Sequence, residues 1–432
     1  MPIWDSEIER MERSEMEQLQ LERLQATVNR VYRDVPFYHR KFQQLNIAPE
    51  DVQSLQDVAK LPFTTKDDLR DGYPYEMFAV PLREIVRIHS SSGATGKPVV
   101  VGYTRNDLDH WSEQVARIMS AAGVTKDDVV QIAFDYGLFT GGFGMHYGAE
   151  RLGASVIPVS LGHTERQIQI MQDFRSTALV STPSYALYMV EMMNRIGVYP
   201  SGLCLRVGLF GGEPMSDRTR EEIERRLGIV ATDNYGVSAL MGPGIAGECE
   251  LRDGLHVNED HFLVEIIDPE TLQVLPEGEF GEMVITTLTK EGIPMIRYRT
   301  RDVTRLTREP CKCGRTTARM APVGRRTDDM IIVRGVNVYP SEIESLLYDI
   351  EHVEPHYQIL VDREGGLDYL TLRVELSSVM ISDQMQKLVE LEETIKRRVH
   401  AVVGLTPRVR LVEAKTLEKV DRSNRIIDSR ER

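Results

Sequence analysis

The chain has 432 residues, of which 41% are hydrophobic and 27% are charged, and this composition is typical of a globular protein with more than one domain. Its net charge of -14 argues against a nucleic-acid partner, because such binding relies on clustered lysine and arginine side chains. The N-terminal region lacks the pattern of a secretory signal, and no apolar run is long enough to span a bilayer. We therefore expect a cytoplasmic enzyme or binding protein with no membrane partner, and four cysteines do not suggest a disulfide framework.

The first part of the chain predicts an α/β fold. Residues 7–42 have the pattern of an amphipathic helix. Apolar runs then alternate with helical patterns, and these runs cover residues 129–134, 155–160, 177–182 and 204–214. Short buried strands separated by helices indicate a large N-terminal body built on a parallel, helix-covered sheet.

The pattern changes from about Glu248 onward. Residues 261–288 alternate like antiparallel strands with Gly and Pro turns, which predicts a β subdomain attached to the body. Beyond residue 325 the order of strands and helices predicts a small, mobile α+β domain. We expect a large domain at residues 1–325 and a small domain at 326–432, with a hinge at 323–329.

A glycine-rich segment, SSSGATGKPVVVGYT at residues 90–104, has the composition of a phosphate-binding loop that runs into a strand. Its donors are backbone N–H groups at glycines, side-chain hydroxyls and one ammonium, and they come from Ser91, Ser92, Gly93, Thr95, Gly96 and Lys97. Together these groups form an anion nest. The spacing is not that of a Walker loop, and taken alone the segment is equally compatible with a flexible turn.

This loop resembles the phosphate loop of the adenylate-forming superfamily of acyl-CoA synthetases, adenylation domains and luciferases. Segments along nearly the whole chain, among them LPFTTKDDLRD, YGLFTGGFGMHYGAERLGASVIPVS and DDMIIVRGVNVYPSEIE, narrow the resemblance to the phenylacetate-CoA ligase family. The resemblance implies that ATP, with Mg²⁺, and an aryl acid give an acyl adenylate and pyrophosphate. Coenzyme A then takes the acyl group.

The resemblance also implies roles for nucleotide-binding residues by their position. The loop ending at Lys97 holds the β and γ phosphates, Asp302 accepts hydrogen bonds from the ribose hydroxyls, and Arg326 touches the nucleotide. The residues implied to bracket adenine and the α phosphate are Gly212, Glu213, Pro214, Asn234, Tyr235, Gly236 and Ser238. Outside this context Asp302 would be read as a carboxylate on a surface turn.

The aryl acid is implied to lie beside the segment FDYGLFTGGFG. Tyr136 and Phe139 would supply an aromatic wall, while Gly141, Gly142 and Gly144 would leave room for a flat ring. The alternative is that these aromatic side chains simply fill the core.

The small domain is implied to contribute to the coenzyme A site when it rotates between the two half-reactions. The segment RGVNVYP resembles the one that lines the pantetheine channel, and it contains Gly335 and Asn337. A glycine at this point permits close approach of the backbone to a ligand.

Two departures from the family pattern affect the predicted chemistry. The family has a magnesium-binding glutamate where this chain has Ala239 in YGVSA. The family also has a catalytic lysine in its C-terminal tail, and the nearest match here is Arg422, whose planar guanidinium is not equivalent to an ammonium. Lys97 and Arg422 are therefore the candidate catalytic residues, and a solvated tail charge is the alternative for Arg422. Nucleotide binding is a safer prediction than turnover.

Three cysteines and a histidine form a candidate zinc site. Cys249 precedes His256 by seven residues, and Cys311 and Cys313 are two apart in PCKCGR. Three thiolates and an imidazole suit a structural, tetrahedral Zn²⁺ with no open coordination position. The alternative is that these are unrelated reduced cysteines on turns.

Three functional hypotheses remain from the sequence. The first is an ATP-dependent aryl-CoA ligase of the phenylacetate type. The second keeps ATP but uses a different acceptor, as in synthetases that adenylylate a deazaflavin coenzyme. The third is a nucleotide- or CoA-binding homologue with weak ligase activity, because Ala239 and Arg422 replace expected catalytic groups. A homodimer contact through the acidic N-terminal helix is possible.

Overall fold

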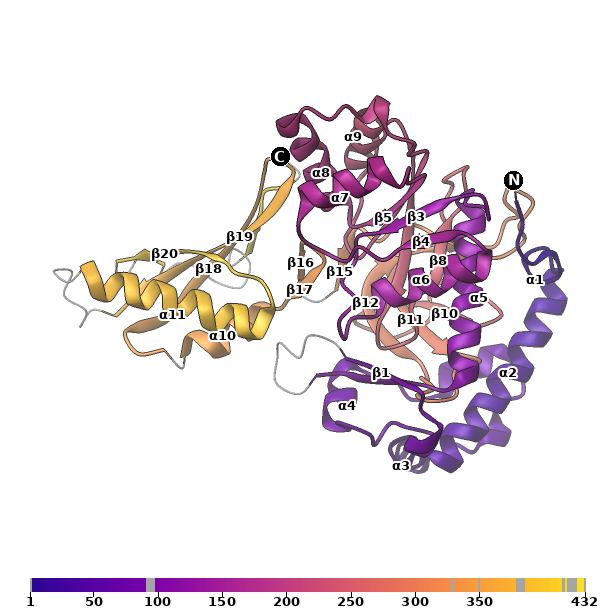
Figure 1. The fold of residues 1–432 in the computed structure, drawn as a ribbon. Helices are drawn as coiled ribbons and strands as arrows, with labels where there is room; N and C mark the ends of the chain where they lie inside the picture. Colours follow the sequence, from indigo (N-terminus) through magenta and orange to yellow (C-terminus); the bar gives the residue numbers. More distant parts are fainter. Residues whose placement is uncertain are drawn as a thin grey trace. The chain divides into compact units, whose positions relative to one another are not determined.

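The computed structural model describes residues 2–90, 98–327, 330–348, 350–377, 385–413, 416–417 and 426–430 (Figure 1). The chain divides into two compact units. The larger unit contains most residues up to 328, and the smaller unit contains most residues from 329 onward. The domain boundary expected between residues 325 and 326 stays a prediction.

The helices of the described chain differ widely in length. They are α1 (Ser6–Glu9), α2 (Arg13–Asp34), α3 (Pro36–Leu45), α4 (Lys66–Asp71), α5 (Arg105–Ala121), α6 (Thr140–Leu152), α7 (Thr164–Asp173), α8 (Pro183–Ile196), α9 (Asp217–Leu227), α10 (Pro340–Tyr348) and α11 (Met385–Val403). Short 3-10 helices occur at Pro49–Asp51, Leu55–Lys60, Leu82–Glu84 and Pro200–Gly202.

The single N-terminal helix expected over residues 7–42 is wrong, because this region forms three helices, α1 to α3. Asp5 caps α1 by accepting hydrogen bonds from the first backbone N–H groups. Helix α2 ends at Val35, which has an extended backbone because it precedes a proline. Pro36 then begins α3, where its missing N–H costs nothing.

The main sheet of the larger unit has nine strands in the order β13-β14-β9-β8-β7-β6-β5-β3-β4. In chain order these are β3 (Val129–Ile132), β4 (Ser155–Ile157), β5 (Ala178–Ser181), β6 (Val207–Gly211), β7 (Val230–Val237), β8 (Gly242–Glu248), β9 (Leu255–Val257), β13 (Leu306–Thr307) and β14 (Arg319–Met320). Strands β4, β3, β5, β6 and β7 are parallel, which confirms the α/β prediction. Strands β8, β9, β14 and β13 continue the same sheet in antiparallel pairs, which the sequence did not predict.

A second sheet of the larger unit is entirely antiparallel. Its strands are β10 (Phe262–Ile267), β11 (Gly281–Thr287), β12 (Tyr298–Thr304) and β15 (Arg325–Arg326), in that order. This sheet matches the antiparallel pattern expected after residue 248. A separate hairpin, β1 (Arg87–Ser90) and β2 (Val100–Tyr103), flanks the glycine-rich loop. Residues 91–97 of that loop lie outside the described residues.

The smaller unit is an α+β fold, as expected. Its sheet has the order β20-β19-β18-β21, and its strands are β18 (Val353–Glu364), β19 (Leu367–Leu376), β20 (Arg408–Val412) and β21 (Ile426–Asp428). Strands β18 and β19 are antiparallel, while β20 and β21 add in parallel on either side. A hairpin of β16 (Ile331–Val333) and β17 (Val336–Val338) precedes α10, and apolar residues of α10, α11 and the sheet share one core.

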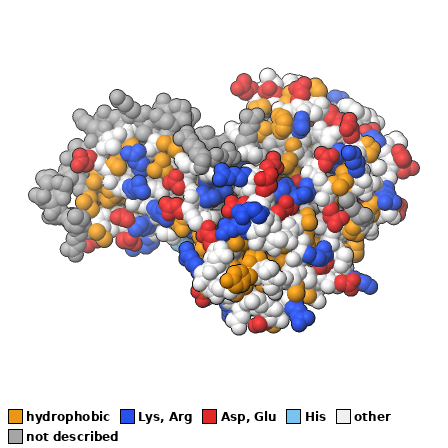
Figure 2. Space-filling model, turned by 90° about the horizontal axis from the view of Figure 1, so that it is seen from above, with side chains coloured by type: hydrophobic (Ala, Val, Ile, Leu, Met, Phe, Trp, Pro, Cys, Tyr) orange, Lys and Arg blue, Asp and Glu red, His pale blue; other side chains and the backbone are white. Residues whose placement is uncertain are grey.

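The surface carries charges of both signs. Figure 2 shows basic and acidic side chains next to one another over the face in view. Ion pairs of the larger unit include Arg151 with Glu113 and Arg226 with Glu222. None of the helices in the described part of the chain has the length and apolar character needed to cross a membrane.

Candidate active site

A cavity in the larger unit lies at the carboxyl ends of three strands, β3, β6 and β7. In open α/β sheets this edge is where ligands commonly bind, because the loops that follow parallel strands meet there. The lining residues are Phe134, Phe139, Thr140, Gly141, Met145, Leu209, Phe210, Gly211, Gly212, Asn234, Gly236, Ser238, Gly242 and Pro243. Six of the residues predicted from the sequence meet here, namely Phe139, Gly141, Gly212, Asn234, Gly236 and Ser238.

Two positions beside this cavity need glycine, one for its backbone conformation and one for a close backbone contact. Gly212 has a φ of 76°, in the left-handed region that favours glycine. A Cβ on Gly236 would lie 2.4 Å from the carbonyl oxygen of Gly242 and 2.5 Å from the Cα of Pro243. Only glycine therefore lets β7 run this close to the start of β8. Glu213 is buried directly after Gly212, whereas Pro214 is exposed.

Asn234 offers a polar group on the cavity wall. Its Nδ2 donates to the carbonyl of Phe210 at 3.3 Å. Its Oδ1 is buried and has no hydrogen-bond partner among the described residues. A buried acceptor without a partner is uncommon in native structures and indicates a missing donor. Ser238 lies nearby, with its hydroxyl 2.8 Å from that of Thr140.

Asp302 is held between two side chains from neighbouring segments. It lies in β12, is only 6% exposed, and pairs with Arg326 of β15 both through the strand register and as an ion pair. Its second carboxylate oxygen accepts from the hydroxyl of Tyr235 at 2.5 Å. Burial and the charge of Asp302 raise the pKa of Tyr235. Asp302 is thus not a carboxylate on a surface turn, and three predicted residues form one cluster.

The glycines of α6 have a different role from the one expected. A Cβ on Gly142 would lie 2.5 Å from the carbonyl oxygen of Asp135, and a Cβ on Gly144 would lie 2.6 Å from both Trp111 and Pro243. The prediction that Gly142 and Gly144 leave room for a ligand ring is therefore wrong, because protein atoms already occupy that space. Gly144 lets α6 pack closely against α5 and β8 (Figure 1), and Gly142 lets it approach the backbone of the loop that precedes α6.

Tyr136 is not among the residues that line the cavity. Its ring meets Phe143 edge to face at 5.2 Å, and its hydroxyl lies 3.3 Å from Nδ1 of His146. Burial raises the pKa of Tyr136. The aromatic wall expected from Tyr136 and Phe139 therefore reaches the cavity through Phe139 in this structure.

The remaining predicted residues lie outside the described residues or belong to the smaller unit. Ser91, Ser92, Gly93, Thr95, Gly96, Lys97 and Arg422 lie outside the described residues. Gly335 and Asn337 belong to the β16–β17 hairpin of the smaller unit. Arg334 and Gly335 have positive φ values of 53° and 75°, so the glycine serves a tight hairpin turn.

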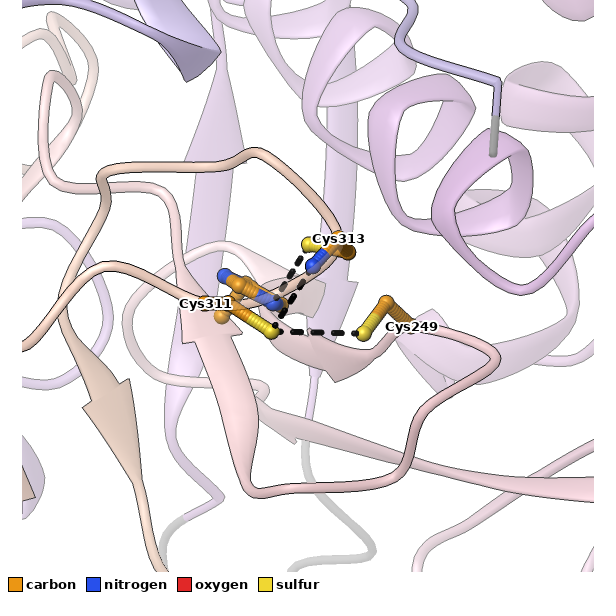
Figure 3. A group of neighbouring side chains, drawn as sticks. Cys249, Cys311 and Cys313 are labelled. Carbon is orange, nitrogen blue, oxygen red and sulfur yellow. Dashed lines mark hydrogen bonds between the residues drawn. The ribbon is translucent and has the colours of Figure 1, made fainter.

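The four predicted zinc ligands lie together at the antiparallel end of the main sheet. Cys249 follows β8, His256 lies in β9, and Cys311 and Cys313 lie between β13 and β14. All four side chains are buried, and their ligand atoms lie within 4.8 Å of one another. Figure 3 shows the sulfur of Cys249 close to that of Cys311, which lies with Cys313 on another loop.

The distances in this cluster suit a tetrahedral zinc. Ligands at about 2.0–2.3 Å from the metal are separated from one another by roughly 3.3–3.8 Å. The sulfurs of Cys249 and Cys311 are 4.0 Å apart, and Sγ of Cys313 lies 3.5 Å from Nε2 of His256. The other ring nitrogen of His256 lies 3.2 Å from the hydroxyl of Thr317. Such a bond fixes the ring so that Nε2 faces the cluster.

Electrostatics favour the thiolate form of Cys311 and Cys313, whereas the hydrogen bond with Cys313, together with burial, raises the pKa of Cys249. Hydrogen bonding from Cys249, followed by that from His256, lowers the pKa of Cys313 against the opposing effect of burial. The backbone N–H of Cys313 also points at Sγ of Cys311 at 3.5 Å. Arg315, which is buried, lies 3.6 Å from Sγ of Cys313 and forms an ion pair with Glu9. The loop is thereby connected to α1.

Asp233 is a buried carboxyl group that the sequence did not point to. Its neighbour Glu248 directly precedes the predicted zinc ligand Cys249. Asp233 precedes Asn234 in β7, and burial, reinforced by the charge of Glu248, raises its pKa to about 7. Glu248 itself pairs with Arg220 of α9. No motif marks this aspartate in the sequence, because its pKa depends on burial and on a neighbour fifteen residues away.

This pKa predicts a stability that depends on pH. The ordinary pKa of an aspartate is about 3.9, so between pH 4 and 7 the folded protein binds more protons at Asp233 than the unfolded chain does. The contribution of this group to the free energy of unfolding therefore falls as pH rises through that window. Asp233→Asn removes the effect. Relative to wild type, we expect the variant to gain ~2.5 kcal/mol in free energy of unfolding between pH 5 and pH 8.

Urea unfolding of both proteins at the two pH values measures this gain. Asp268→Asn is the control, because hydrogen bonds from the N–H groups of Thr271 and Glu270 lower the pKa of Asp268. That variant should show no gain on going to pH 8. A difference between wild type and Asp233→Asn that stays constant with pH would contradict the assignment.

Comparison with known proteins supports the family expected from the sequence. The AMP-binding enzyme family matches residues 40–289, and the AMP-binding enzyme C-terminal domain matches residues 335–430. The phenylacetate-coenzyme A ligase of Escherichia coli (strain K12) is 48% identical over 96% of this chain and 95% of the relative. The enzyme of that name from Thermus thermophilus is 47% identical over 95% of each chain.

The fold also matches a solved structure. A crystal structure of 2-hydroxyisobutyryl-CoA ligase in complex with 2-HIB-AMP and CoA superposes with a TM-score of 0.95 at 31% identity, covering 99% of this chain and 93% of that chain. With the matching family and the two relatives, this likeness extends over almost the whole chain. The chain belongs to the phenylacetate-coenzyme A ligase family of AMP-binding enzymes.

Proposed function

We propose that the protein is an ATP-dependent acid–thiol ligase that joins an aryl acid such as phenylacetate to coenzyme A. In the first step a carboxylate oxygen of the acid attacks the α phosphorus of ATP, and pyrophosphate leaves. In the second step the sulfur of coenzyme A, having lost its proton, attacks the acyl carbon, and AMP leaves. The observation that carries this proposal is the convergence of six predicted residues on one cavity at the ends of β3, β6 and β7.

Each part of the cavity suits a part of the ligand. Phe134, Phe139 and Met145 present apolar surface of the kind that a phenyl ring needs. Asn234 is a polar residue of the cavity wall, and we assign it to the adenine end of the nucleotide. The carboxylate of Asp302, which already accepts from Tyr235 and Arg326, is an acceptor-only group of the kind that binds ribose hydroxyls. These roles are proposals, as are those of the residues outside the described ranges.

Magnesium is general in AMP-forming ligases, where it neutralises charge on the phosphates. At the place of the family glutamate this chain has Ala239, which packs into the hydrophobic core and has no metal ligand to offer. We therefore assign no step to a magnesium ligand at this position. This departure, with the absence of a lysine at the tail position of Arg422, favours a second candidate function, a nucleotide-binding homologue with weak ligase activity.

One assay separates the two candidates. The purified protein is supplied with ATP, Mg²⁺, coenzyme A and phenylacetate, and pyrophosphate release is measured with each substrate omitted in turn. Release that requires phenylacetate, with formation of the thioester, supports the ligase. Nucleotide binding by calorimetry without pyrophosphate release supports the binding homologue. If the protein binds no adenosine nucleotide, both proposals fail.

We further propose that Cys249, His256, Cys311 and Cys313 hold a structural zinc. The support is the convergence of four buried ligand atoms of the types that zinc prefers. With four protein ligands the ion would have no open position for substrate, so its role is to brace the loop between β13 and β14. The cytoplasmic location and the homodimer expected from the sequence stay predictions.

A further inference from the structure

Buried side chains support one wall of the cavity, residues 238–243, which form the turn after β7 and the first two residues of β8. This segment, the turn, joins β7 to β8 and contributes Ser238, Gly242 and Pro243 to the lining. Nζ of Lys290 donates to the carbonyl oxygen of Leu240, within the turn, at 2.5 Å. The turn therefore depends on a contact from a residue about fifty positions later in the sequence.

Two aromatic side chains support the same turn. The hydroxyl of Tyr103 donates to the carbonyl of Met241 at 2.8 Å, and Nε1 of Trp111 donates to the carbonyl of Pro243 at 2.7 Å. The two rings stack, with centroids 4.9 Å apart and planes 10° apart. Three buried donors thus satisfy three carbonyls of one short turn.

Lys290 is itself held in place from the start of α5. The carboxylate of Asp107 accepts from the backbone N–H groups of Glu291 at 2.7 Å and Gly292 at 2.9 Å. The same carboxylate accepts from the N–H of Thr104, which caps the helix. The backbone beside Lys290 is therefore anchored to a rigid element, and the direction of its side chain is set by that anchor.

The environment of Lys290 is an unusual one for an amine. The side chain is 2% exposed, and its Nζ lies 4.1 Å from the centre of the Tyr103 ring. Among the ion pairs of the described residues none includes Lys290. Burial lowers its pKa to about 7, with Asp107 acting in the opposite direction. An apolar side chain of similar length would avoid this desolvation cost but could not donate to Leu240.

We propose that Lys290 is a positioning residue, which fixes the turn at 238–243 through the carbonyl of Leu240 and so sets the affinity of the cavity for nucleotide. The inference rests on the proposed function, because it places the nucleotide in that cavity. Lys290 acts through the backbone and touches no reacting atom. The sequence assigned Lys290 no role, although it lies in the segment GEMVITTLTKEGIPMIRYRTRD, which resembles the family.

The test compares Lys290→Met with a matched control, Lys41→Met. Lys41 also donates to a backbone carbonyl, that of Phe63 at 2.9 Å, and lies 4.5 Å over the ring of Phe37. Unlike Lys290 it forms an ion pair, with Asp68, and neither it nor these partners line the cavity. ATP affinity is measured by calorimetry, and thermal melting is measured on the same samples. We expect Lys290→Met to weaken ATP binding at least tenfold without lowering the melting temperature, and Lys41→Met to leave ATP binding unchanged.

A second variant covers the case in which Lys290→Met does not fold. Tyr103→Phe keeps the ring but removes the hydroxyl that holds Met241, and we expect it to weaken ATP binding three- to tenfold. If Lys290→Met is folded and binds ATP as the wild type does, the inference about Lys290 is wrong. If Lys290→Met is unfolded, unchanged ATP affinity in Tyr103→Phe has the same meaning. Neither result bears on the proposed function. A wild-type protein that binds no ATP overturns the proposed function, and this inference fails with it.

Discussion

Replacing Cys311 by serine is expected to abolish zinc binding and to lower the melting temperature of the protein. The wild-type protein, grown with zinc, should contain one ion per chain by atomic emission. In Cys311→Ser the remaining three ligands leave the tetrahedral set incomplete. Structural zinc sites contribute about 10–16 kcal/mol of binding free energy in small domains. Even a fraction of this amount, transferred to folding, shifts the melting temperature of the larger unit by many degrees.

The chain provides its own control for this experiment. Cys204 is the one cysteine outside the cluster and is exposed, so Cys204→Ser should keep both the zinc and the melting temperature of the wild type. Zinc content that stays at one ion per chain in Cys311→Ser would contradict the site. So would a wild-type protein without zinc that melts at the same temperature before and after zinc is added.

Loss of the metal is expected to affect α1 as well, because Arg315 connects the zinc loop to Glu9. Arg315 contacts Sγ of Cys313, the carboxylate of Glu9 and, at 2.8 Å, the carbonyl of Pro2. The backbone N–H of Thr316 adds a bond to the carbonyl of Glu9 at 2.9 Å. If the loop loses its shape without zinc, α1 loses its anchors as well. Zinc removal is therefore also expected to expose the N-terminal residues to limited proteolysis.

The zinc cluster and the cavity show what sequence spacing can predict. Cys311 and Cys313 belong to a knuckle that is visible in the sequence, and Cys249 and His256 were added because they lie seven residues apart in a chain with only one other cysteine. The cavity was predictable because loops that follow parallel strands meet at one edge of the sheet. The residues at the ends of β6 and β7 were assigned to one site by the family resemblance, and the strand topology explains why they meet there.

Other features could not be predicted because they depend on contacts between distant segments. The spacing of Gly142 and Gly144 suits an open pocket and a close helix contact equally well, and only the positions of Trp111 and Pro243 decide between them. The strands from β8 onward alternate as an antiparallel sheet does, but alternation does not reveal that they extend the parallel one. Lys290 is a loop residue in sequence and a buried donor in space.

Asp302→Asn is expected to weaken nucleotide binding, and this is the second large effect that the structure predicts. A hydrogen bond to a charged group contributes about 1.5–3 kcal/mol. Asparagine keeps the size of the side chain but replaces one acceptor oxygen with a donor and removes the charge. We therefore expect the dissociation constant for ATP or AMP to rise roughly tenfold to a hundredfold, as measured by calorimetry.

The control variants separate this effect from damage to the fold. The carboxylate of Asp268 accepts hydrogen bonds from the backbone N–H groups of Glu270 and Thr271, in its own turn. Asp268→Asn should therefore leave ATP affinity unchanged. Tyr235→Phe removes one bond to Asp302 but keeps the carboxylate and Arg326, so it should weaken binding less than Asp302→Asn does. Because Asn at 302 also leaves Arg326 without its ion pair, urea unfolding must show that the variant is folded under the conditions of calorimetry. A folded Asp302→Asn protein with wild-type affinity for ATP and AMP would exclude Asp302 from the nucleotide site.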